Sequence, residues 1–103
     1  MKYLIVQPYD RVTARPTGEQ CPILFPANEH VSHKDVAAVH RASARAVVAA
    51  AFCDISFYPD RVDVVAYGSS ESLRHERPSR TEDAGIIAAM VDRFVAATSV
   101  PPQ

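Results

Sequence analysis

Glycine, cysteine and tryptophan are scarce in this sequence. The 103 residues include three glycines, two cysteines and no tryptophan. Three glycines leave little material for a phosphate-binding loop, and neither the G-x-x-x-x-G-K-[ST] nor the G-x-G-x-x-G pattern is present. Cys21 and Cys53 are too few for the disulfide framework of a small secreted domain, so we expect no bridge between them in a reducing compartment.

An excess of charge and long apolar runs are also missing. The formal net charge of −1 argues against a strongly basic nucleic-acid binder and against a polybasic membrane anchor. The apolar run after Lys2 ends at Gln7 and Pro8, which is shorter than the roughly 7–15 apolar residues of a signal peptide. No window approaches the ~20 apolar residues of a membrane span. We therefore expect a soluble cytoplasmic protein without a membrane partner.

The length suits one domain with one core. Apolar residues make up 48% and charged residues 22%, which is the balance of an ordinary globular domain. A chain of this length is too short for two independent cores. We predict a single domain over residues 1–98 and a flexible C-terminal tail over 99–103.

The first part of the chain predicts two strands. Residues 2–6 (KYLIV) form a continuous run of strand formers and are typical of a buried strand. Residues 8–20 contain two prolines and mixed charge and are predicted to be a loop. Residues 22–26 (PILFP) are apolar but bounded by prolines, which lack the N–H for a ladder hydrogen bond, so they favour an edge strand.

A long helix is predicted over residues 33–52. Ser32 followed by Asp35 is a variant of the capping box at a helix start. The twenty residues after Ser32 lack glycine and proline, and eight of them are alanine, the best helix former. Because the apolar residues run nearly all round at 46–52, we expect that part to be buried on more than one side, either in the core or against a second copy of the chain.

The second half predicts a hairpin and another helix. Residues 54–68 alternate apolar and polar side chains on both sides of a turn at Pro59 and Asp60. Residues 69–80 are polar and are predicted to be a loop. A helix begins near 81, capped by Ser79 with Glu82 or by Thr81. Its apolar stripe comprises Ile87, Met90, Val91, Phe94 and Val95.

Together these elements predict an α+β domain. The order is strand, edge strand, helix, strand, strand, helix. The simplest packing is two-layered, with a small mixed sheet of three or four strands and both helices on one face. A helix between the first strand and the hairpin suggests a right-handed crossover.

Metal binding is one hypothesis for the histidines. His30 and His33 lie three apart where the chain turns into the long helix. Zinc prefers tetrahedral clusters of Cys and His, so a site there would need further ligands such as Cys21 or Glu29. His40 is two helical turns beyond His33, ~10.5 Å along the axis, and is too far to share an ion. Surface histidines at a helix start are the simpler interpretation, and we predict neither metal nor cofactor.

Catalysis by a nucleophile has little sequence support. No G-x-S-x-G pattern occurs, and the segment YGSSES after a predicted strand lacks the second glycine. Cysteine is usually buried and inert, and we interpret Cys53 in this way. A small hydrolase or metal enzyme therefore ranks as the third hypothesis, and no catalytic residue is assigned.

A basic surface is the second hypothesis. The segment RHERPSR runs into a helix N-terminus, where free N–H groups favour anions. Basic side chains on the predicted long helix recur at steps of seven and four, which puts them on one face. Nucleic acid or phosphate would then contact Arg74, Arg77, Arg80, Lys34, Arg41 and Arg45. Against this, Glu82 and Asp83 are placed to pair with Arg77 and Arg80, and no aromatic residues interleave to stack on bases.

The preferred hypothesis is a non-enzymatic binding domain. Its partner would be another protein or a second copy of the chain, since no catalytic set is visible and the apolar content is high for the proposed helix. The segments GSSESL and RPSRTEDAGII resemble small proteins of phages and mobile elements, a resemblance that assigns no role to any residue.

Overall fold

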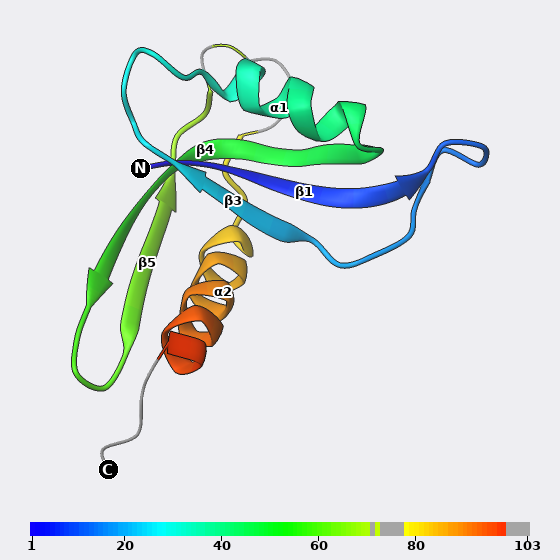
Figure 1. The fold of residues 1–103 in the computed structure, drawn as a ribbon. Coiled ribbons are helices and arrows are strands. Elements are labelled where there is room, and N and C mark those ends of the chain that lie inside the picture. Colours follow the sequence, from blue (N-terminus) through cyan, green and yellow to red (C-terminus); the bar gives the residue numbers. More distant parts are fainter. Residues whose placement is uncertain (71, 73–77, 99–103) are drawn as a thin grey trace.

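A computed structural model of the protein describes residues 1–70, 72 and 78–98. The predicted tail at 99–103 and half of the predicted loop at 69–80 lie outside these residues. The strands are β1 (Lys2–Asp10), β2 (Arg15–Pro16), β3 (Cys21–Phe25), β4 (Arg45–Phe57) and β5 (Val62–Tyr67), and the helices are α1 (His33–Ala42) and α2 (Asp83–Thr98). The predicted α+β class is confirmed (Figure 1).

Every strand pairing in the sheet is antiparallel. β1 lies between β3 and β4, and β5 continues the sheet beyond β4. The short β2 pairs with the far end of β1. The sheet is therefore not mixed as the sequence suggested, and the connection from β1 to β4 is not a right-handed crossover, which joins parallel strands. The predicted edge strand at 22–26 and the hairpin at 54–68 are both confirmed.

The two helices cover opposite faces of the sheet. Successive side chains of a strand point to opposite faces. Tyr3 and Ile5 of β1 belong to the core under α2, whereas Leu4 and Val6 belong to the core under α1. Figure 1 shows α1 on one side of β1 and β4 and α2 on the other. The prediction that both helices share one face was wrong because the central strands are apolar on both sides.

The predicted helix over 33–52 is wrong after its first half. α1 ends at Ala42, and residues 45–57 form β4, the longest strand. The start of the helix is as predicted, since Ser32 Oγ accepts from the Asp35 N–H at 3.1 Å and the Asp35 carboxylate accepts from the Ser32 N–H at 3.2 Å. The break falls at Ala44, whose φ of 58° is left-handed. A left-handed residue ends a helix, although glycine usually fills this position.

Small side chains explain why the alanine-rich segment forms a strand. β4 is a central strand with a helical layer on each side. Ala49 and Ala51 face the α2 core and Ala50 faces the α1 core, and all three are fully buried. Strands buried on both faces have continuous apolar runs, which periodicity alone does not distinguish from a buried helix. Tertiary packing overrides the helix propensity of alanine here.

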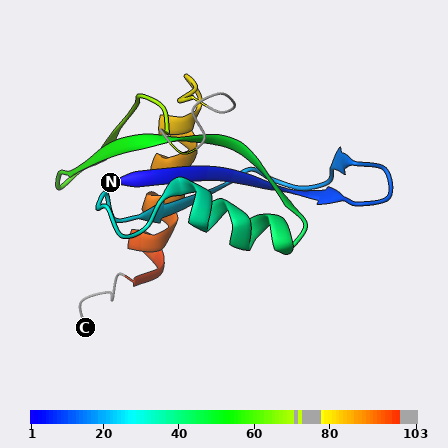
Figure 2. The ribbon, with the colours of Figure 1, turned by 90° about the horizontal axis from the view of Figure 1, so that it is seen from above.

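The sheet curls around α2. The register between β1 and β4 shifts between Ile5 and Val6, and such a bulge bends the strand and increases its twist. α2 contacts β5 and β3, so the helix lies in the concave side of the curl and approaches both outer strands. Figure 2 shows the long β1 and β4 ribbons crossing the molecule, with the turn after β1 projecting at one end.

A buried carboxylate holds the start of α2 against β1. The Tyr3 hydroxyl donates to Asp83 Oδ2 at 2.7 Å, and both side chains are fully buried. Arg80 donates to the same carboxylate through its backbone N–H at 2.9 Å and through Nε at 2.8 Å. Its guanidinium also donates to Gln20 Oε1 at 2.8 Å. Burial and the adjacent carboxylate both raise the pKa of the Tyr3 phenol, which therefore keeps its proton as the donor.

Ala44→Gly tests the position of the helix end. Glycine adopts a left-handed φ without the steric cost that alanine carries there, so we expect this substitution to raise the free energy of unfolding by about 0.5–1 kcal/mol. Ala38→Gly, at an exposed position inside α1, is the matched control and should lower it by about 1 kcal/mol. Urea denaturation measures both. Equal losses at the two positions would mean that the helix continues through residue 44.

Tyr3→Phe tests the buried hydrogen bond to Asp83. The substitution keeps the ring and removes the donor, leaving a buried carboxylate with one partner fewer, so we expect a loss of about 1–3 kcal/mol in the free energy of unfolding. Tyr67→Phe is the matched control, because this ring is 44% exposed. It should change stability by less than about 0.5 kcal/mol. Similar values for the two variants in urea denaturation would contradict the proposed role of Tyr3.

Candidate functional site

An apolar groove lies where α2 diverges from the curled sheet. Its volume is about 600 Å³. It lies between the C-terminal half of α2, the end of β4 and the middle of β3. We call this site the apolar groove, and its lining residues are Met1, Leu24, Cys53, Asp54, Ile55, Phe57, Met90, Val91, Phe94 and Val95.

The groove exposes side chains that would normally belong to a core. Val91 is only 7% exposed, but Phe94, one turn further along α2, is 67% exposed. Phe57 at the end of β4 is also 67% exposed. The predicted apolar stripe of α2 is therefore covered by the sheet at Ile87 and Val91 and opens to solvent beyond them. Exposed apolar patches bordering a hollow mark interaction sites.

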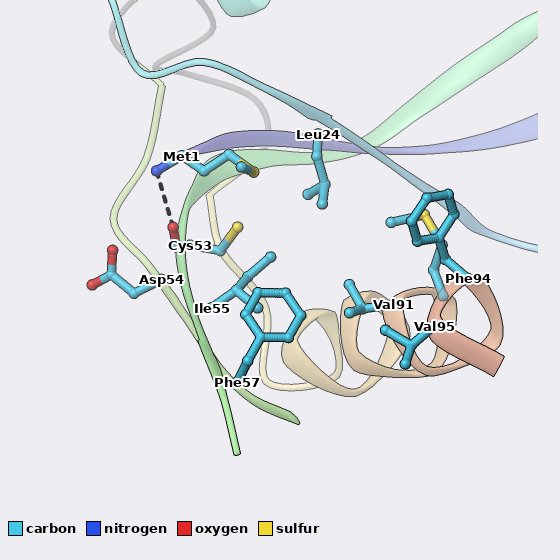
Figure 3. Close-up of a pocket in the computed structure, with 10 residues that line it drawn as sticks. Met1, Leu24, Cys53, Asp54, Ile55, Phe57, Val91, Phe94 and Val95 are labelled. Atoms are coloured by element: carbon cyan, nitrogen blue, oxygen red, sulfur yellow. Dashed lines mark hydrogen bonds between the residues drawn. The ribbon is translucent and has the colours of Figure 1, made fainter. Parts of the chain in front are cut away.

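Figure 3 shows how the side chains are arranged around the groove. Leu24, Ile55 and Val91 point toward one another from three different elements, and the Phe57 ring lies beside Ile55. The Asp54 carboxylate points away from the hollow, as expected for a neighbour of inward-facing residues on a strand. The Met1 amino group donates to the Cys53 carbonyl at 3.1 Å and is turned toward that backbone.

Cys53 lies in the floor of the groove and has the environment of an unreactive thiol. Its side chain is fully buried, and burial raises the pKa of its thiol. Since the thiolate is the nucleophilic form, this environment works against reactivity. Cys21 is exposed on β3, and both cysteines are free. The arrangement agrees with the interpretation of Cys53 as a buried, inert thiol.

His33 has a structural environment rather than a surface one. It is 3% exposed, and its ring lies edge-on to Phe25 and Phe52 at centroid distances of 5.3 and 5.4 Å. Nε2 lies 2.7 Å from the Ala51 carbonyl oxygen. Because a carbonyl only accepts, Nε2 carries the proton and is not free to bind a metal. Burial lowers the pKa of His33, so the neutral ring is the native form.

The other residues of the metal hypothesis are separate from this ring. His30 is exposed, and its backbone N–H donates to the Asn28 side chain at 3.0 Å. The Cys21 thiol lies 3.7 Å from the Glu19 carbonyl oxygen. Among residues 1–70, 72 and 78–98, no three His, Cys, Asp or Glu side chains are grouped so that they would hold a metal ion.

A second, polar hollow of about 390 Å³ lies at the start of α1. Lys2 reaches into this region and donates from Nζ to the carbonyls of Asn28 and Val31 at 2.9 and 2.8 Å. The helix N-terminus already holds the Asp35 carboxylate, whose pKa is lowered by its hydrogen bonds with Ser32. That negative charge disfavours a further anion at the same helix end. The polar hollow is lined by Lys2, Ala27, Asn28, Ser32, His33, Phe52 and Ser72.

The described basic residues have separate surroundings. Arg80 is bound to Asp83 and forms an ion pair with Glu82 at 3.3 Å, which is the local pairing that the sequence allowed. Lys34 and Arg41 are exposed on α1, but Arg45 begins β4 and donates to His40 Nδ1 at 3.0 Å. The prediction that Arg45 shares a helix face with Lys34 and Arg41 was therefore wrong. Arg74 and Arg77 lie outside the described residues.

Comparison with known proteins gives no relative for this chain. No protein-family model, curated protein or solved structure matches it. Nothing in these comparisons supports the phage or mobile-element origin that the sequence resemblance suggested. In the described part of the chain, no helix is both long enough and apolar enough to cross a membrane.

Because the His33 ring is buried, we predict that acid lowers the free energy of unfolding. An unfolded histidine has a pKa of about 6.5, and the native value is lower. Below pH 6.5 the unfolded chain therefore binds a proton that the native ring resists. The free energy of unfolding should fall as pH drops from 7.5 to 5, by up to about 1.4 kcal/mol per pH unit, until the native ring titrates. Urea denaturation at several pH values measures this slope.

Two variants test whether His33 causes this pH dependence of the free energy of unfolding. His33→Gln keeps a donor for the Ala51 carbonyl and removes the titrating group, so its stability should depend less on pH. His40→Gln is the control, because His40 is less buried, although burial and the Arg45 charge also lower its pKa. A wild-type slope in His33→Gln, or a larger flattening in His40→Gln, would exclude His33 as the main cause.

Proposed function

We propose that this protein is a non-enzymatic binding domain whose binding surface is the apolar groove. The observation that carries the proposal is the exposure of Phe57 and Phe94 beside a hollow of about 600 Å³. The floor of the hollow is part of the protein core, through Cys53 and Val91. Binding would complete a core that the sheet and α2 leave open.

Energetics support binding at this place. A phenylalanine side chain buries roughly 150–250 Å² when fully covered, so covering the exposed two-thirds of Phe57 removes about 100–170 Å² from water. At about 25 cal/mol per Å², that single contact contributes about 2.5–4 kcal/mol. A groove of 300–1,000 Å³ with apolar walls is also the usual form of a ligand site.

The alternatives have weaker support in the described residues. A nucleic-acid interface would need several free basic side chains on one surface, and Arg80 is engaged with two carboxylates. An enzyme would need an activated nucleophile or base, whereas the Cys53 thiol is held in its protonated form by burial. A protein partner or a second copy of the chain, which the sequence favoured, would bind at the same groove.

The groove should bind N-phenyl-1-naphthylamine, an uncharged dye that brightens in apolar surroundings. We expect saturable enhancement with the wild type. Phe57→Ser removes one wall and Val95→Trp fills the mouth, and each should weaken binding about tenfold or more. Fluorescence titration gives the dissociation constants. No enhancement with folded wild-type protein would contradict the proposal.

Val65→Ser is the matched control for both groove variants. Val65 is 59% exposed on β5, on the face of the same hairpin opposite the groove. This variant should bind the dye as the wild type does. If it loses affinity as strongly as Phe57→Ser, the dye is binding to exposed apolar surface in general, and the groove is not the binding site.

A further inference from the structure

We infer that the natural occupant of the apolar groove is an uncharged, mainly hydrocarbon small molecule. This inference rests on the proposed function and names its ligand class. It depends on three features of the groove: its depth, the absence of charge directed into it among the described residues, and the adaptable side chains in its wall.

The depth of the groove suits a small molecule that enters the protein interior. The hollow lies between the concave side of the sheet and α2, and its floor includes the fully buried Cys53. Its volume of about 600 Å³ lies in the usual range for small-molecule sites, and the groove is open to water. Carbon-lined walls offer such water few hydrogen-bond partners, so a ligand that displaces it gains the hydrophobic free energy.

The charges around the groove favour an uncharged occupant. Among the described residues of the lining, Asp54 is the only acidic or basic side chain, and its carboxylate points away from the hollow. The Met1 ammonium also lies at the lining, but it donates to the Cys53 carbonyl and is turned toward that backbone. An anion inside the groove would find no cationic side chain directed toward it among the described lining residues. A cation inside the groove would lack a partner, and burying an unpaired charge is strongly unfavourable. The wall therefore discriminates against both signs of charge.

The composition of the wall allows it to fit a ligand. Both methionines of the chain, Met1 and Met90, line the groove. Methionine has an unbranched, polarisable side chain that fills irregular gaps and is common at adaptable apolar binding surfaces. These two side chains therefore allow the wall to adjust to the shape of a ligand.

The test uses three decyl compounds that differ only in the head group. Since the chain has no tryptophan, Phe57→Trp introduces a single tryptophan, whose emission reports on the groove wall. Decanol should shift its emission to shorter wavelength, with a dissociation constant at least tenfold lower than those of decanoate and decylammonium at pH 8. Tyr67→Trp, on the opposite face of the hairpin, is the control and should show no shift. If Phe57→Trp does not fold, displacement of the naphthylamine dye from the wild type gives the same comparison.

The outcomes separate this inference from the proposed function. If the dye binds in the groove but decanoate or decylammonium competes as well as decanol, the ligand class is wrong and the binding site stands. If light scattering shows the wild type at twice its 11.3 kDa mass and Phe57→Ser as a monomer, a second copy occupies the groove and the small-molecule inference is overturned. If neither dye nor decanol binds, both the inference and the proposed function fail.

Discussion

The buried carboxylate of Asp83 is the constraint on which the rest of the structure depends. A charge without solvent must be paired, and its partners come from three places: Tyr3 on the central strand, the Arg80 guanidinium and the Arg80 backbone. Such a pair adds little net stability, because desolvation offsets most of the attraction, but it specifies one arrangement. It fixes where α2 begins against β1. The course of α2 along the concave sheet, and hence the opening at its far end, follows from that point.

The sequence predicted β1, the hairpin and the start of α1 well and the strand β4 badly. The strand at 2–6, the hairpin and the capping box of Ser32 each depend on local chemistry that a single sequence contains. Residues 45–52 depend instead on what lies above and below them. Alanine favours a helix by propensity but is also the residue that lets two helical layers approach one strand. Only the tertiary arrangement decides between helix and strand for residues 45–52, so the local sequence pattern could not predict the strand.

The groove was missed for a related reason. Its walls come from the chain start, β3, β4 and α2, and no sequence motif joins them. The pattern of α2 identified Phe94 as apolar, but whether an apolar residue is covered depends on how far the sheet extends beneath it. The curl set by the bulge at Ile5 and Val6 determines that extent. His33 shows the same limit, because its apolar neighbours and the Ala51 carbonyl are remote in sequence.

The left-handed Ala44 has a consequence for how the chain folds. Residues on both sides of it favour a helix, so in the unfolded chain transient helical structure extends across the position where the native protein turns. In the native protein the second half is instead a strand between β1 and β5. Local preference and final topology disagree here, which is a source of frustration on the folding landscape. We therefore expect the alanine-rich strand β4 to be stable only when β1 and the two helices are packed against it.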